Sequence, residues 1–130
     1  MFAQLESPVL GRWYWMSTRI RCALQPDEPR LLDLFLNETR YLIAWERVPA
    51  WLLFEKCYQL FLDTAHDIAL PWHWRVQCLN HAYRPFHELQ CLVRSREQRC
   101  RLHQLAMRLA NQDMQPSLSY HEPQEGIEND

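Results

Sequence analysis

The chain has 130 residues, of which 48% are hydrophobic and 23% are charged, and its formal net charge is −2. A chain of this length is expected to form one domain that buries roughly two thirds of its unfolded surface, and its apolar content excludes a wholly disordered protein. Gly11 and Gly126 are its only glycines. Phosphate-binding loops and dinucleotide-binding fingerprints need closely spaced glycines, so the sequence excludes them. The low glycine count also argues against a many-stranded sandwich, whose tight turns normally need this residue.

Prolines divide the chain into segments whose apolar residues have helical spacing. Proline suits the first turn of a helix because its φ is fixed and its missing N–H would have no partner there. The periodicity predicts helices over 8–24, 29–46, 50–68, 72–84 and 85–111, with Pro85 either kinking the fourth helix or starting the fifth. The predicted core stripe of the second helix is Leu31, Leu34, Phe35, Leu42 and Trp45, and that of the fourth is Trp72, Val76, Leu79 and Tyr83.

The short connections between these segments favour antiparallel neighbours. We therefore expect an all-α fold, a single compact bundle of four to five mostly antiparallel helices, within residues 1–111. Residues 112–130 are polar and acidic and lack periodicity, which predicts a disordered acidic C-terminal tail.

The last predicted helix is not uniform. Its first apolar residues, Phe86, Leu89 and Val93, lie almost opposite to Leu102, Leu105 and Leu109 at about 100° per residue. Either the helix breaks near 95–99, or its two halves pack against different surfaces.

Basic charge is concentrated in the last two predicted helices, directly before the acidic tail. Residues 72–110 carry seven arginines against two glutamates, while 111–130 carry five acidic residues and no basic one. Arginine suits bidentate contacts to carboxylate or phosphate. Four of these side chains, Arg94, Arg96, Arg99 and Arg101, fan over more than half of a helix, so we expect them to face water or a partner. Compensation of this charge within the chain is the alternative.

Tryptophans two residues apart point in different directions on a helix, so both members of such a pair cannot be buried equally. We expect one of Trp72 and Trp74 to be exposed, and we place both with the four arginines as candidate partner-binding residues. Trp13 and Trp15 form a second pair. Together the pairs predict more exposed aromatic surface than a monomer needs.

Signals for chemistry are weak. Cys78 and His81, and likewise Cys100 and His103, have the spacing of zinc ligands on one helical face, but the interval between the pairs is not that of a familiar zinc module. We therefore predict ordinary packing, with no metal or cofactor. His66-Asp67 is similar to the central dipeptide of metal phosphohydrolases, which also need an earlier histidine that this chain lacks. A cysteine nucleophile with a distant histidine stays open, but nothing singles one out.

These observations predict a non-catalytic interaction protein, a regulator or chaperone-like adaptor that binds a polypeptide partner or a second copy of itself. The alternative is a nucleic-acid-binding regulator that uses the arginine-rich segment 94–101. No apolar run reaches the ~18 residues of a membrane span. An odd set of five cysteines and the absence of a secretory signal favour reduced thiols in the cytoplasm.

Overall fold

Proline marks the start of four helices, as the sequence predicts. The computed structural model describes residues 8–118. Its helices are α2 (Pro8–Arg21), α3 (Arg30–Trp45), α4 (Ala50–Ala65), α5 (Trp72–His81), α6 (Tyr83–Leu92) and α7 (Arg96–Ala110). Pro8 is the first residue of α2, and Pro29, Pro49 and Pro71 directly precede α3, α4 and α5.

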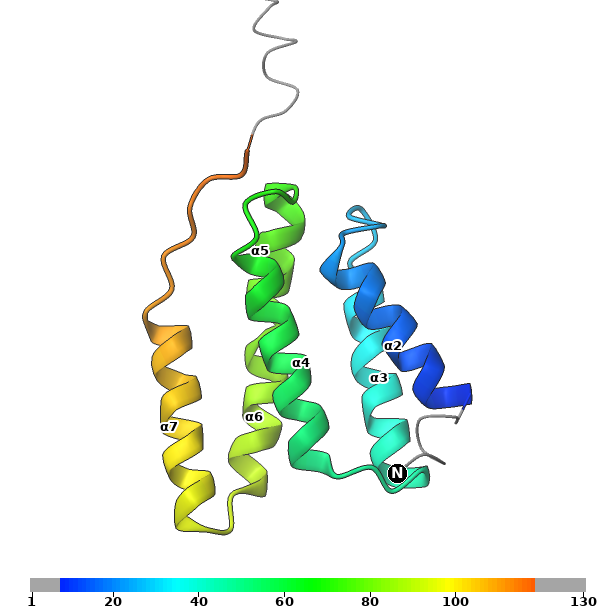
Figure 1. Ribbon diagram of the computed structural model, residues 1–130, viewed down its shortest axis with the longest axis vertical. Helices are drawn as coiled ribbons and strands as arrows, with labels where there is room; N and C mark the ends of the chain where they lie inside the picture. The colour runs from blue at the N-terminus through cyan, green and yellow to red at the C-terminus, as the bar shows by residue number, and fades with distance from the viewer. Residues whose placement is uncertain (1–7, 119–130) are drawn as a thin grey trace, which may run out of the picture.

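The helices form an antiparallel bundle (Figure 1). Only Ala82 separates α5 from α6, so these two helices form one bent segment, here called the α5–α6 leg. Counting this leg as one element, consecutive elements of the bundle run in opposite directions (Figure 1). No strand occurs between residues 8 and 118. The predicted all-α bundle is therefore confirmed, and Pro85 lies in the first turn of α6, directly after the bend at Ala82.

Helix α4 is the centre of the core. It lies between the hairpin of α2 and α3 on one side and the α5–α6 leg on the other (Figure 1). Its inward side chains, Cys57, Tyr58, Phe61 and Leu62, are fully buried. The Tyr58 hydroxyl donates to the backbone oxygen of Leu105, which attaches α7 to the bundle.

Two buried indoles connect helices that are distant in sequence. Trp13 Nε1 on α2 donates to Thr39 Oγ1 on α3 at 2.8 Å, and Trp74 Nε1 on α5 donates to the backbone oxygen of Ile20 at 2.9 Å. The Thr39 hydroxyl in turn lies 2.9 Å from the Phe35 backbone oxygen. Burial of these rings is possible because each polar end has a partner.

The core faces of two helices differ from the prediction. On α3, Leu34 and Trp45 are exposed, because the buried face is shifted to include Leu32, Leu36 and Thr39. On α5, Trp72 is exposed and the buried residues are Trp74, Arg75 and Cys78. Tyr83, assigned to the same predicted stripe, is also exposed. In both helices a hydrogen-bonded polar side chain occupies a core position, which hydrophobic periodicity does not anticipate.

The last predicted helix breaks, which settles the question left open by its two apolar faces. Helix α6 ends at Leu92 and α7 begins at Arg96. Ser95 is the N-cap of α7: its hydroxyl oxygen accepts from the Gln98 backbone N–H at 3.0 Å. Gln98 Oε1 accepts from the Arg94 N–H at 2.7 Å, so the sequence Ser95-x-x-Gln98 acts much like a capping box.

The chain after α7 is held against the bundle up to the end of the described part. The Ser117 hydroxyl donates to the Leu70 backbone oxygen, and the Leu118 N–H donates to the Ile68 backbone oxygen, each at 2.7 Å. The first part of the predicted tail, 112–118, is therefore placed against the bundle, and residues 119–130 lie outside the described residues. Within 8–118, no helix combines the length and apolar character required to cross a bilayer.

We expect Ser95→Ala to lower the free energy of unfolding by about 1 kcal/mol, the usual contribution of an N-cap hydroxyl. Urea unfolding followed by circular dichroism measures the change. Ser17→Ala is the control, because the Ser17 hydroxyl only donates to the Tyr14 backbone oxygen within α2 and its loss should change stability by less than about 0.5 kcal/mol. Equal effects of the two substitutions would contradict the capping role.

Candidate protein-binding surfaces

The hairpin of α2 and α3 presents an apolar groove to solvent. The groove encloses about 580 Å³. Its apolar lining consists of Trp15, Met16, Leu31, Leu34 and Tyr41. Trp15 is 57% exposed, Leu34 55% and Tyr41 43%. Side chains of this size are unusual on the surface when they gather in one place, so the groove is a candidate binding site.

Charged side chains border the groove. Arg12 Nε on α2 lies 2.6 Å from Glu38 Oε2 on α3, so an ion pair connects the two helices at its edge. Arg19 and Glu28 also contribute to the lining. An apolar centre with a polar border of both signs is the usual composition of a protein–protein interface.

The apolar strip continues along α3 beyond the groove. Trp45 is 72% exposed, and its ring centroid lies 6.5 Å from that of Tyr41. Leu34, Tyr41 and Trp45 therefore form an outward strip on the side of α3 that does not face the core.

The four predicted arginines on and before α7 divide into two groups. Arg94 Nη1 donates to the backbone oxygens of Cys91 and Val93, and Arg101 forms an ion pair with Glu55 on α4. Arg96 and Arg99 are exposed and form no ion pair with the described acidic residues; they line a shallow hollow of about 470 Å³ with Cys100, His103 and Gln104. Of the four, Arg96 and Arg99 are thus the two whose guanidinium groups contact no other described residue through a hydrogen bond or ion pair.

Much of the positive charge of residues 72–110 is compensated by the helices before it. Arg84, Arg101 and Arg108 pair with Asp33, Glu55 and Asp63 respectively. The hydrogen bond from Arg101 is the main cause that lowers the pKa of Glu55. Among the described residues, the acids that neutralise this segment belong to α3 and α4.

One member of the tryptophan pair on α5 is exposed and the other is buried, as predicted. Trp72 is exposed and Trp74 is fully buried. Trp74 therefore has no surface to offer to a partner and leaves the candidate surface, whereas Trp72 remains on it. The α2 pair divides in the same way, with Trp13 buried and Trp15 exposed.

Residues 8–118 contain no group of three or more His, Cys, Asp or Glu side chains placed to hold a metal ion. Cys78 is buried in the core while Cys100 is exposed on α7. Burial raises the pKa of the Cys57 and Cys78 thiols to about 12, so both stay protonated at neutral pH. His66, which the sequence pairs with Asp67, has a pKa lowered mainly by burial, and its Nδ1 lies 3.2 Å from the Leu62 backbone oxygen.

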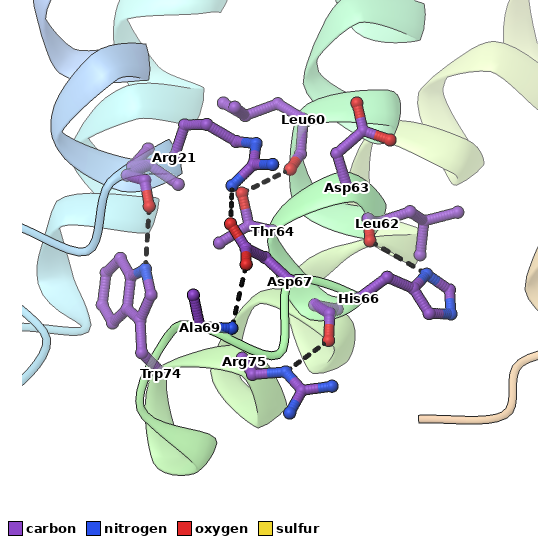
Figure 2. A network of polar contacts seen from close by, with 12 residues as sticks. Arg21, Leu60, Leu62, Asp63, Thr64, His66, Asp67, Ala69, Trp74 and Arg75 are labelled. Atoms are coloured by element: carbon purple, nitrogen blue, oxygen red, sulfur yellow. Dashed lines mark hydrogen bonds and ion pairs between the residues drawn. The ribbon is translucent and has the colours of Figure 1, made fainter. Parts of the chain in front are cut away.

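A polar network closes the end of the bundle where α4 leads into α5 (Figure 2). Asp67 Oδ2 accepts from Arg21 Nη1 at 2.6 Å, and Asp67 Oδ1 accepts from the Ala69 N–H at 3.0 Å. Arg75 Nε donates to the backbone oxygen of Ala65 at 2.8 Å. The His66-Asp67 dipeptide thus has a local structural explanation: Asp67 joins the end of α2 to the α4–α5 turn.

Comparison with protein families, with curated proteins and with solved structures found no match to this chain. The functional argument therefore depends on its own surfaces. The sequence indicated excess aromatic surface through the pair Trp13 and Trp15 without saying which is exposed. It assigned Leu34 and Trp45 to the core and did not single out Tyr41. The outward spacing of these three residues, at i, i+7 and i+11, was the available signal.

We expect Asp67→Asn to lower stability at pH 7 by about 1 kcal/mol, a value discounted for the partial exposure of Arg21. The hydrogen bond from Arg21 is the main cause that lowers the pKa of Asp67 in the folded protein. The carboxylate therefore stabilises the fold above the unfolded pKa of about 3.9, and this contribution is lost as the pH falls through the folded pKa.

Urea unfolding at pH 7 and in acid measures the effect, and the difference between wild type and Asp67→Asn should shrink below about pH 4. Asp63→Asn is the matched control, because Asp63 is an exposed residue whose loss should change stability by less than about 0.5 kcal/mol. A pH-independent difference for Asp67→Asn would contradict the assignment.

Proposed function

We propose that this protein is a non-catalytic protein-binding module, a regulator or adaptor, whose α2–α3 groove binds an amphipathic helix of a partner protein. The observation that carries the proposal is the gathering of Trp15, Leu34 and Tyr41, all half-exposed, in one groove between two helices. Exposed tryptophan and tyrosine dominate the residues that contribute most to binding at protein interfaces.

The shape of the groove favours a helix as the occupant. Two antiparallel helices form a long slot, and an apolar strip of a third helix fits such a slot through residues spaced at i, i+3, i+4 and i+7. Both signs of charge at its border, Arg12, Arg19, Glu28 and Glu38, match the mixed polar flanks of an amphipathic helix. Because the two arginines and two glutamates balance, the groove has no net charge that would attract a strongly charged ligand.

A nucleic-acid partner is the second candidate, and it would use α7. Arg96 and Arg99 are exposed, and His103 joins them in the same hollow. This surface lies at the opposite edge of the bundle from the groove (Figure 1). Arg101 is paired with Glu55 and Nη1 of Arg94 contacts backbone oxygens, so Arg96 and Arg99 are the two arginines of this segment whose guanidinium groups form no hydrogen bond or ion pair inside the described chain.

Photo-crosslinking tests the groove directly. Tyr41 in the groove and Tyr83 on α6 are both exposed tyrosines, so each can be replaced by benzoylphenylalanine in the full chain and irradiated in the native cell. We expect an adduct with a distinct polypeptide at position 41 and none at position 83. A nuclease-sensitive adduct, or one with twice the mass of this chain, would overturn the proposed partner.

With the captured partner, Trp15→Ala should lower affinity at least tenfold, because an exposed indole at the centre of an interface contributes more than ~1.4 kcal/mol. Stability should stay within about 0.5 kcal/mol of wild type. The Arg96→Gln/Arg99→Gln double variant should bind as wild type does. Loss of binding in that variant, with affinity falling by orders of magnitude between ~50 and ~200 mM salt, would instead favour nucleic acid.

A further inference from the structure

Arg75 on α5 lies inside the protein and is the only fully buried charged residue among residues 8–118. Besides the bond from Nε to Ala65, its Nη1 donates to Ser117 Oγ at 2.8 Å. Nη2 is buried, and no described residue accepts a hydrogen bond from it. The ring centroid of Trp72 lies 5.1 Å from the guanidinium carbon. The cation is therefore surrounded by neutral oxygens and an aromatic face.

Within residues 8–118, no carboxylate forms an ion pair with Arg75. Asp67 acts on it electrostatically, but the Asp67 carboxylate already bonds to Arg21 and to the Ala69 N–H. A buried guanidinium without a carboxylate or phosphate is costly, and it gains strongly from any oxyanion that reaches its two terminal nitrogens.

The C-terminal strap, residues 112–118, covers this guanidinium. Ser117 supplies the neutral oxygen that Nη1 contacts, and it is held in place by its own bond to Leu70. Leu118 adds one backbone bond to Ile68. The amide nitrogen and oxygen of Gln112 are buried without partners. A strap with few bonds and unsatisfied polar atoms belongs to the part of a fold that opens at low free-energy cost.

We propose that Arg75 is an oxyanion-binding residue and that the Ser117 hydroxyl occupies its site in place of the ligand. The ligand class is a carboxylate or phosphate group, which offers two oxygens to Nη1 and Nη2 where Ser117 offers one. Arginine binds such groups through both terminal nitrogens in one plane. The strap lifts from Arg75 when the oxyanion takes the place of Ser117.

An oxyanion placed on the strap itself tests the site in the full chain. Ser117→Asp adds a carboxylate beside Nη1 and Nη2, and we expect it to raise the Tm by about 3–6 °C. Gln115→Asp adds the same charge at an exposed strap position, and its Tm should stay within about 1 °C of wild type. The gain from Ser117→Asp should fall by at least half in the Arg75→Lys background, since lysine keeps the charge but lacks the fork.

A second measurement does not depend on the stability of an Arg75 variant. In Ser117→Ala the strap no longer bonds to Arg75, and 10 mM inorganic phosphate or sodium acetate should shift the Nε–Hε resonance of Arg75 in a saturable manner. Sodium chloride at equal ionic strength should not. Saturation by phosphate alone assigns a phosphoryl ligand, and saturation by acetate assigns a carboxylate. No saturable shift with either anion, or a Ser117→Asp Tm equal to that of Gln115→Asp, overturns the proposal.

Discussion

A buried indole N–H must find an acceptor, and this requirement determines how the α2–α3 hairpin presents its surface. Trp13 points inward because its Nε1 has Thr39 Oγ1 to bond. Residues two apart on a helix lie about 200° apart, so Trp15 must point outward. The same relation on α3 sends Tyr41 outward once Thr39 is inside. The hydrogen bond between Trp13 and Thr39 inside the hairpin therefore places Trp15 and Tyr41 in the groove on its outside.

The same requirement connects the two ends of the core. Trp74 Nε1 bonds to the backbone oxygen of Ile20, so the start of α5 is fixed against the end of α2. Nearby, Asp67 bonds to Arg21, the last residue of α2. The turn between α4 and α5 is therefore positioned by residues more than 40 positions earlier in the chain. The position of this turn then fixes where Arg75 and the C-terminal strap lie.

Local rules predicted the helices well, and long-range polar contacts explain where they failed. The prolines gave the starts of α2 to α5 to within one residue because their effect on the backbone is local. The predicted core faces of α3 and α5 were wrong because Thr39 and Arg75 are buried against hydrogen-bond partners that only the folded chain brings near them. The pattern Ser95-x-x-Gln98 is a local signal for the start of α7, and the prediction from apolar periodicity did not use it. The groove combines side chains of two helices, so the sequence could indicate only that one of Trp13 and Trp15 is exposed.

Two helix ends are closed without glycine. Ala23, after α2, and Arg47, after α3, both adopt left-handed backbone angles, with φ of 50° and 58°. Around Ala23 the bonds from Leu24 N–H to Arg19 and from Ala23 N–H to Ile20 form a Schellman motif, whose left-handed position is usually glycine. A side chain there costs about 1 kcal/mol. Alanine and arginine codons each become a glycine codon by one base change. A single mutation at either position can therefore stabilise the fold and offset destabilising changes on the binding surfaces.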